Sequence, residues 1–164
     1  MRLARPGSDC RALYAACRSE YANGMTKPAP LDDSILMQLR QAATGAAQHA
    51  YAPYSNFRVG AALLLENGSI ISGCNVENAS FGLTICAERS AMVQAVARFG
   101  SAVRVRAAVV VNLNRASSSP CGACRQFLAE FAPPDTPIYF PDNDGQAMQT
   151  LSSLLPFGFS RASL

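Results

Sequence analysis

Hydrophobic residues are arranged in two different patterns along the chain, first a helical repeat and then continuous runs. From Asp32 to Pro53 apolar residues return every three or four positions, which predicts an amphipathic helix that starts near Asp32 or Asp33. The apolar stripe of this helix consists of Ile35, Leu36, Leu39, Ala42, Ala43, Ala46 and Ala50. Two apolar runs follow, one before and one after Asn67 and Gly68. Because Asn-Gly is a strong signal for a tight hairpin turn, we expect two antiparallel strands here.

Helices and strands then alternate in the remaining pattern. Residues 86–100 and 121–131 have the spacing of core helices, and residues 106–113 form an apolar run typical of a strand that is buried on both faces. Residues 137–140 predict one more strand, and a short helical turn is expected from residue 151 onward. Such alternation favours a single sheet covered on both faces by helices.

The first thirty residues differ from the rest of the chain. Their pattern predicts a short helix that ends at Gly24, and Pro28 and Pro30 then interrupt any regular structure. We therefore predict an N-terminal extension and linker over residues 1–30 and a single domain over residues 31–164.

The composition is that of a globular protein with a lightly charged surface. Hydrophobic residues make up 49% of the chain and charged residues 15%, and the net charge of +3 comes from scattered arginines. Without a basic block, nucleic acid is not an expected partner. No apolar run approaches the roughly 20 residues of a membrane-spanning helix, and the N-terminus lacks a signal-peptide core. We expect a cytoplasmic protein, in which closely spaced cysteines bind metal or act in catalysis more often than they form disulfides.

Three cysteines and a glutamate form the main candidate site. Cys121 and Cys124 start one predicted helix and Cys86 starts another, and helix N-termini favour thiolates. If the two helix ends meet, three sulfurs can hold zinc and leave a fourth position open for water, as in catalytic sites. Glu88 can then carry protons to and from that water, provided that Cys86 is the helix cap, since mid-helix residues two apart point roughly 200° apart. Arg89 is the expected counter-charge to the thiolates.

Two other interpretations of the cysteines stay open on this reasoning. A redox pair of thioredoxin type leaves Cys86 and Glu88 without a role. A structural zinc needs a fourth ligand, for which His49 and Cys74 are candidates. His49 is more simply a packed or solvated side chain, and Cys74 a small buried hydrophobe.

The sequence resembles the zinc-dependent nucleoside deaminases, and in particular the small homotetrameric cytidine deaminases whose first ligand is cysteine. The defining pattern is Cys-Ala-Glu at residues 86–88 followed by Pro-Cys-Gly-Ala-Cys at residues 120–124. Longer stretches agree with the same subfamily, namely residues 51–64, 73–89, 119–128 and 154–159. The resemblance implies a three-layer α/β/α cytidine deaminase-like fold with a mixed sheet of about five strands.

The resemblance also implies a reaction, the hydrolytic deamination of cytidine and 2′-deoxycytidine in pyrimidine salvage. It makes Cys86, Cys121 and Cys124 the zinc ligands and Glu88 the proton shuttle. The nucleoside substrate is a small molecule, and the implied assembly is a homotetramer.

The resemblance further assigns residues to the substrate. Asn75 and Glu77 would hold the ribose 3′-hydroxyl, and Phe57 would pack against the base. Ala87 would orient the base through its backbone, and Phe159 would reach the site of a neighbouring subunit. Without the resemblance, Asn75 and Glu77 are equally well interpreted as turn residues, and Phe159 as part of a tail that docks on the core.

Two departures from the family pattern stand out. Phe81 occupies a position where the family often has tyrosine, and the residues after Phe159 differ from the usual ending. The alternatives are a deaminase of another cytosine nucleoside, such as blasticidin S, or a non-catalytic zinc or redox module. The stretch from Asn75 to Ser80 argues against the antibiotic, and Glu88 favours an enzyme over a passive module. Polynucleotide editing is disfavoured by the lack of a basic groove.

Overall fold

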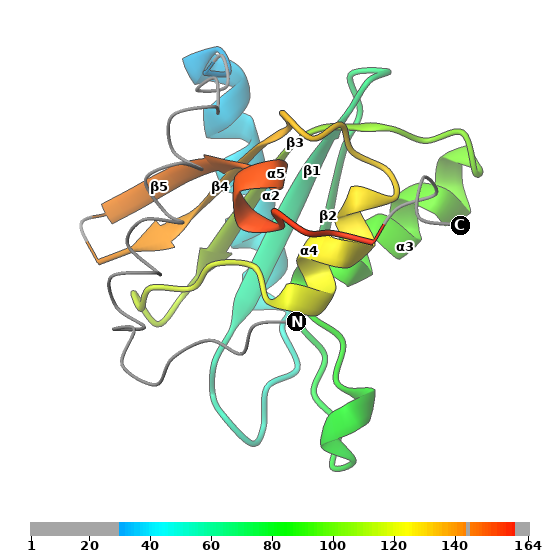
Figure 1. Cartoon of the computed structure of the whole chain (residues 1–164). Coiled ribbons are helices and arrows are strands. Elements are labelled where there is room, and N and C mark those ends of the chain that lie inside the picture. Colours follow the sequence, from blue (N-terminus) through cyan, green and yellow to red (C-terminus); the bar gives the residue numbers. More distant parts are fainter. Residues whose placement is uncertain (1–29, 144, 160–164) are drawn as a thin grey trace, which may run out of the picture.

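The computed structural model describes residues 30–143 and 145–159, so the short helix predicted before Gly24 lies outside the described residues. The described chain forms three layers, with a five-stranded sheet between helices (Figure 1). The strands are β1 (Val59–Leu65), β2 (Ile70–Cys74), β3 (Val105–Asn112), β4 (Pro137–Asp142) and β5 (Gly145–Thr150). The helices are α2 (Asp33–Gln48), α3 (Ala87–Phe99), α4 (Gly122–Ala129) and α5 (Leu151–Leu154), with a 3-10 turn η1 (Phe81–Leu83). The predicted α/β/α fold is confirmed.

The sheet is mixed, with strand order β2-β1-β3-β4-β5. Strand β1 pairs antiparallel with β2 and with β3, β3 pairs parallel with β4, and β4 pairs antiparallel with β5. The hairpin predicted at Asn67 and Gly68 is present: Gly68 has a positive φ of 81°, a conformation that costs glycine little, and its N–H donates to the carbonyl of Leu65.

Each face of the sheet has its own hydrophobic core. Helix α2 packs on one face, where Leu39 and Ala43 contact side chains of the central strands, among them Leu64 and Val109. Helices α3, α4 and α5 cover the other face, and Figure 1 shows them on the opposite side of the sheet from α2. Apolar burial on both faces explains why β1 is hydrophobic along its whole length rather than alternating.

Two glycines set the distance between helices and sheet. A Cβ atom on Gly60 would lie 1.9 Å from the carbonyl oxygen of Ala43 in α2, and one on Gly73 would lie 2.5 Å from the backbone nitrogen of Ala91 in α3. Only glycine permits such close approach of two backbones. Gly73 therefore fixes how deeply α3, and the residues at its N-terminus, sit against β2.

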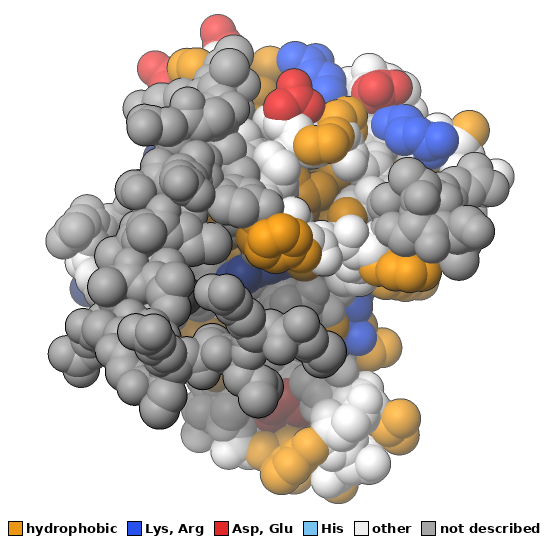
Figure 2. Space-filling model, in the orientation of Figure 1, with side chains coloured by type: hydrophobic (Ala, Val, Ile, Leu, Met, Phe, Trp, Pro, Cys, Tyr) orange, Lys and Arg blue, Asp and Glu red, His pale blue; other side chains and the backbone are white. Residues whose placement is uncertain are grey.

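The chain between β2 and α3 forms a lobe, residues 76–85, that projects from the body with η1 near its tip (Figure 1). Its base is an antiparallel bridge in which Val76 and Ile85 exchange two backbone hydrogen bonds. Hydrophobic side chains stand exposed on this lobe at the foot of Figure 2, and Phe81 is 78% exposed. No helix in the described part of the chain is long and apolar enough to cross a membrane.

Candidate metal centre and substrate cleft

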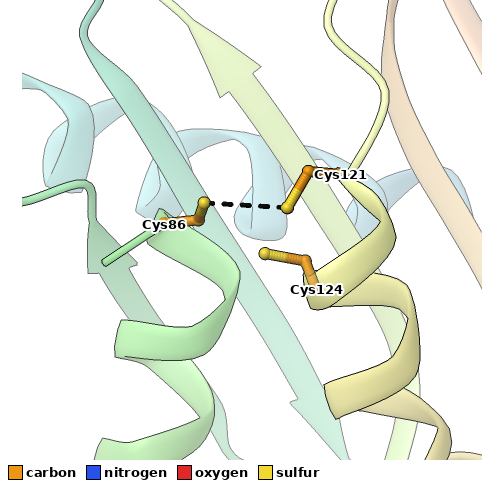
Figure 3. Close-up of side chains that lie close together, drawn as sticks. All are labelled: Cys86, Cys121 and Cys124. Carbon is orange, nitrogen blue, oxygen red and sulfur yellow. Dashed lines mark hydrogen bonds between the residues drawn. The ribbon is translucent and has the colours of Figure 1, made fainter. Parts of the chain in front are cut away.

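Two helices begin at the same place, and each begins with a cysteine. Cys86 is the N-cap of α3 and Cys121 is the N-cap of α4, and both have extended backbone with no capping hydrogen bond from the side chain. Cys124 lies one turn further along α4, and all three side chains point toward one another (Figure 3). The positive ends of two helix dipoles therefore face the three sulfurs and stabilise their thiolate forms.

The spacing of the sulfurs suits a tetrahedral zinc ion. The three Sγ atoms lie within 4.8 Å of one another, and the Cys86 and Cys121 sulfurs are 3.8 Å apart. Tetrahedral coordination with Zn–S bonds of about 2.3 Å requires sulfurs about 3.8 Å apart. The donor set fits zinc, because thiolates are ligands that zinc prefers. Three ligands leave one position open.

Neither of the proposed fourth ligands joins this cluster. Among the described residues, the group that can hold a metal consists of the three cysteines alone. His49 is exposed at the end of α2, and Cys74 is half-buried at the end of β2. The structural-zinc interpretation therefore finds no ligand in the residues that were proposed for it.

Glu88 lies on the first turn of α3 and is only 4% exposed. Because Cys86 is the extended N-cap rather than a helical residue, the two side chains are not forced to opposite sides of the helix, which meets the condition set by the sequence. Burial raises the pKa of the Glu88 carboxyl, and negative charge on Cys86 raises it further. A carboxyl group in this environment accepts and holds a proton more readily than an exposed one.

Arg89 places a guanidinium group against the sulfurs. Its Nη2 donates to Cys86 Sγ at 3.5 Å and to the carbonyl oxygen of Thr84 at 3.2 Å. The Nε atom is buried and has no hydrogen-bond partner within the described residues. The expected contact between Arg89 and the cysteines is present at Cys86, where the guanidinium charge stabilises the thiolate form.

A hydrogen bond between Cys86 and Cys124 moves the pKa values of the two thiols in opposite directions. It is the main reason why the pKa of Cys86 is lowered to about 5, with Arg89 and Cys121 also contributing. The same hydrogen bond, together with burial, raises the pKa of Cys124. The pair therefore favours the thiolate at Cys86 over the thiolate at Cys124.

Comparison with known proteins identifies this arrangement. Residues 33–140 match the family described as the cytidine and deoxycytidylate deaminase zinc-binding region. The chain belongs to this family. It is 49% identical over 116 residues to a cytidine deaminase of Halalkalibacterium halodurans. The aligned residues cover 70% of this chain and 86% of that protein.

Solved structures of the same family agree with the fold. The crystal structure of cytidine deaminase from Mycobacterium leprae is similar with a TM-score of 0.66 at 44% identity, covering 74% of this chain and 97% of that one. The cytidine deaminase of Burkholderia pseudomallei gives a TM-score of 0.68 at 42% identity, covering 75% and 98%.

Asn75, which the family pattern assigns to the ribose, follows directly after β2 and is buried. Its Oδ1 accepts from the N–H of Val59 at 2.8 Å, and its Nδ2 donates to the carbonyl oxygen of Phe57 at 2.9 Å. The side chain thus joins the end of β2 to the segment that enters β1. One lone pair of Oδ1 and one N–H of Nδ2 stay available beyond these two bonds.

Glu77 is partly exposed and borders a cleft of about 420 Å³ lined by Tyr54, Ser55, Glu77, Phe81 and Thr84. Its carboxylate accepts from the N–H of Tyr54 at 2.9 Å and from both the N–H and the hydroxyl of Ser55. These hydrogen bonds, led by the one from Ser55, lower the pKa of Glu77. The carboxylate therefore fixes the 54–55 backbone at the edge of the cleft.

The other residues assigned to the substrate occupy varied positions. Ala87 is buried at the first position of α3, and Phe57 is half-buried just before β1. Phe159 is 61% exposed, so its side chain does not dock on the core of its own chain. Its backbone is tied to α4, because the Gln126 side chain donates to the Phe159 carbonyl at 2.7 Å and accepts from the Phe159 N–H at 3.0 Å.

Sequence reasoning missed the residues that support this site. Ser55 carries a weak signal, since a hydroxyl two residues before Phe57 is typical of a turn, and it accepts from the Phe57 N–H at 3.0 Å. Arg125 and Gln126 carry no such signal, because each has partners in the C-terminal segment about 30 residues further along the chain, at Leu154 and Phe159.

Proposed function

We propose that this chain is a zinc-dependent enzyme that hydrolyses cytidine and 2′-deoxycytidine to uridine and 2′-deoxyuridine with release of ammonia, a reaction of pyrimidine salvage. The observation that carries the proposal is the junction of two helix N-termini, where three cysteine sulfurs lie within 4.8 Å of one another. A buried carboxyl, Glu88, lies on the first turn of one of these helices. Membership of the deaminase family supports the choice of reaction.

Cys86, Cys121 and Cys124 would hold the zinc ion. When bound, zinc polarises a water molecule and lowers its pKa toward neutrality. Negative thiolates reduce the ability of zinc to lower the pKa of the water. The positive charge of Arg89 would partly neutralise them and so limit this reduction. Closely spaced free cysteines are typical of a compartment that keeps thiols reduced, and we place the enzyme in the cytoplasm for this reason.

Glu88 would move the protons of the reaction. It would take one proton from the attacking water and deliver it to N3 of the ring, which makes C4 more electrophilic. It would then transfer the second proton of the water to the departing amino group, so that ammonia leaves and the carbonyl of uridine forms. Its raised pKa suits this role, because the group must both accept and return a proton.

The cleft beside Glu77 would receive the ribose. We assign Asn75 and Glu77 to its 3′-hydroxyl, Phe57 to one face of the base, and the Ala87 backbone to its edge. Free cytosine lacks the ribose hydroxyl and would leave buried Asn75 without this partner, at a cost of about 1–3 kcal/mol. The enzyme should therefore prefer nucleosides to the free base.

We propose further that the enzyme is a homotetramer in which Phe159 contacts the substrate of a neighbouring subunit. Support comes from apolar side chains that the lobe of residues 76–85 exposes, Phe81 at 78% and Leu83 at 66%, and from Phe159 at 61%. Apolar side chains that are exposed together often mark a surface that contacts a partner. Sedimentation equilibrium measures the assembly directly, and a monomer at micromolar concentration would contradict the proposal.

The test of function is the ultraviolet change that accompanies conversion of cytidine to uridine, with Glu88→Gln as the comparison. Loss of a general acid–base group costs roughly 100- to 10,000-fold in kcat, so we expect the variant to be nearly inactive while it binds as much zinc as the wild type. Zinc content is measured by atomic absorption on both proteins. Equal turnover in the two would exclude Glu88 as the shuttle. A wild type that holds zinc but does not convert cytidine would reject this substrate.

A further inference from the structure

Arg125 joins three segments that meet beside the metal centre. Its Nε donates to the carbonyl oxygen of Pro120 at 2.6 Å, and its Nη2 donates to the hydroxyl of Ser119 at 3.1 Å. Its Nη1 donates to the carbonyl oxygen of Leu154, the last residue of α5, at 2.9 Å. One side chain therefore binds the loop that precedes Cys121 and the C-terminal segment at the same time.

The position of Arg125 in the helix makes these contacts possible. It lies four residues after Cys121 and closes the first turn of α4, since its N–H donates to the carbonyl oxygen of Cys121 at 3.0 Å. Long side chains in a helix lean toward its N-terminus, so the guanidinium group of Arg125 reaches back to the peptide just before the N-cap. Arginine suits the place because its planar group offers several donors in a fixed geometry.

Cys121 depends on this support more than the other two cysteines do. Cys124 is buried within α4, and Cys86 follows the paired residue Ile85. Cys121, in contrast, is exposed and sits at the end of a loop. A hydrogen bond to the Pro120 carbonyl fixes the orientation of the peptide that leads into Cys121, and hence the direction in which its sulfur points.

At its start the C-terminal segment is held by the N–H groups of Leu151 and Ser152, which donate to the carbonyl oxygens of Thr136 and Pro134. Helix α5 has only four residues, so its last carbonyl groups lack partners within the helix, and Arg125 supplies one to Leu154. Further along, the paired hydrogen bonds of Gln126 hold the backbone of Phe159 to α4 as well. Two consecutive residues of α4 thus hold the later part of this segment, at Leu154 and at Phe159.

We propose that Arg125 is a positioning residue for the metal centre, and that through it the C-terminal segment 151–159 is part of the scaffold that orients Cys121. The inference rests on the proposed binding of zinc by the three cysteines. Its consequence is mutual: loosening the C-terminal segment weakens zinc binding, and removing zinc loosens the C-terminal segment, because coupling between two sites is reciprocal.

The first experiment measures zinc affinity of the full chain by competition with a chromophoric chelator. Arg125→Lys keeps the charge but loses the fixed set of donors, and we expect its dissociation constant for zinc to rise about 10- to 100-fold, as is typical when a residue that orients a metal ligand is replaced. The matched control is Arg98→Lys, because Arg98 is exposed at the far end of α3 and stacks on Phe99. This control should bind zinc like the wild type.

A cobalt spectrum separates positioning from a loss of folding. In the Co²⁺-loaded proteins, the sulfur-to-metal absorption bands report the geometry of the thiolates. We expect these bands to shift or weaken in Arg125→Lys and to match the wild type in Arg98→Lys, at a temperature well below the unfolding transition of both. Arg125→Lys could instead lower the unfolding temperature and leave both the zinc affinity and the cobalt spectrum unchanged. That result would show that Arg125 only stabilises the fold, and it would overturn the inference.

Hydrogen exchange tests the link to the C-terminal segment. In the wild type, chelation of zinc should speed amide exchange in residues 151–156 as well as in residues 119–124. In Arg125→Lys, exchange in residues 151–156 should already be fast and should no longer respond to zinc. Equal protection of residues 151–156 with and without zinc in the wild type would overturn the coupling.

These measurements distinguish two failures. A wild type that binds neither zinc nor cobalt would reject the metal site on which the proposed function depends. A wild type that binds both, with Arg125→Lys equal to it in every measurement, would reject only the role of Arg125.

Discussion

At the scale of single residues, Glu77 shows how one carboxylate can hold the backbone at the edge of a cleft. Its carboxylate accepts hydrogen bonds from Tyr54 and Ser55, and these bonds lower the pKa of Glu77 below its ordinary value of 4.5. The folded state therefore favours the ionised form. The stabilisation is fully present above the pKa of the unfolded chain and is lost as the pH falls through the lowered pKa of the folded protein.

This difference predicts a pH-dependent effect of Glu77→Gln. Thermal unfolding followed by circular dichroism should show the variant less stable than the wild type at neutral pH, and the gap should close as the pH falls below about 4.5, toward pH 3. Glu66→Gln is the control, because Glu66 is exposed at the hairpin turn. A gap of the same size at both ends of the pH range would show that the carboxylate charge is not what holds the loop.

The cysteines and their neighbours could be predicted from the sequence because their roles follow from residue type and local spacing. Cys86 and Cys121 were expected at helix starts, and both are N-caps. The hydrogen bond between Ser55 and Glu77, in contrast, joins positions 22 residues apart. Neither the residue types nor the local sequence indicate that these two side chains meet. The roles of Asn75, Glu77 and Phe159 toward the substrate stay predictions.

At the scale of the elements, prediction succeeded where the hydrophobic pattern was strong. Helix α2 and the hairpin of β1 and β2 appear where the sequence placed them. Strand β5 was not located, although about five strands were expected, because its sequence carries only Ala147 and Met148 as hydrophobic residues. An edge strand is defined by its pairing with β4, and that pairing depends on tertiary structure rather than on pattern.

The close contact of β2 with α3 predicts a large effect for Gly73→Ala. The added Cβ would meet backbone atoms of α3, so the helix must shift, and overpacking of this kind costs about 1–3 kcal/mol. Because Cys86 and Glu88 lie at the start of α3, zinc affinity should fall with stability. Urea unfolding and chelator competition measure the two effects.

Gly45→Ala provides the comparison for this prediction. Gly45 lies within α2, and a Cβ there meets no atom within 4 Å. Alanine is the better helix former, so the variant should gain roughly 0.5–1 kcal/mol and bind zinc as before. Equal effects of the two substitutions would show that backbone contact at Gly73 does not determine the position of α3.

At the scale of the whole molecule, the described residues from 30 onward form one folded body around a single sheet. The match to the deaminase family begins at residue 33, inside the domain that we propose for residues 31–164. Leu31 is the first residue with a fixed contact in the described chain, since its N–H donates to the Tyr139 hydroxyl at 3.1 Å. We interpret residues 1–30 as an extension that the chemistry does not require.

Removal of residues 1–29 should therefore leave zinc content and turnover of cytidine unchanged. A deletion that extends through residue 33 should lower the unfolding temperature, because it removes both the Leu31 contact and Asp32, the N-cap that accepts from the N–H of Ser34 at 2.8 Å. Loss of turnover in the shorter deletion would assign the extension a part in the site.

The bridge between Val76 and Ile85 has a consequence for how such a protein can evolve. It closes the base of the projecting lobe, and Cys86 follows it directly. Substitutions near the tip, at Phe81 or Leu83, can therefore accumulate without displacing the cysteine. In a lineage of such proteins, the outer surface of the lobe can therefore change while Cys86 keeps its place, because the two hydrogen bonds of the bridge hold the chain just before the cysteine.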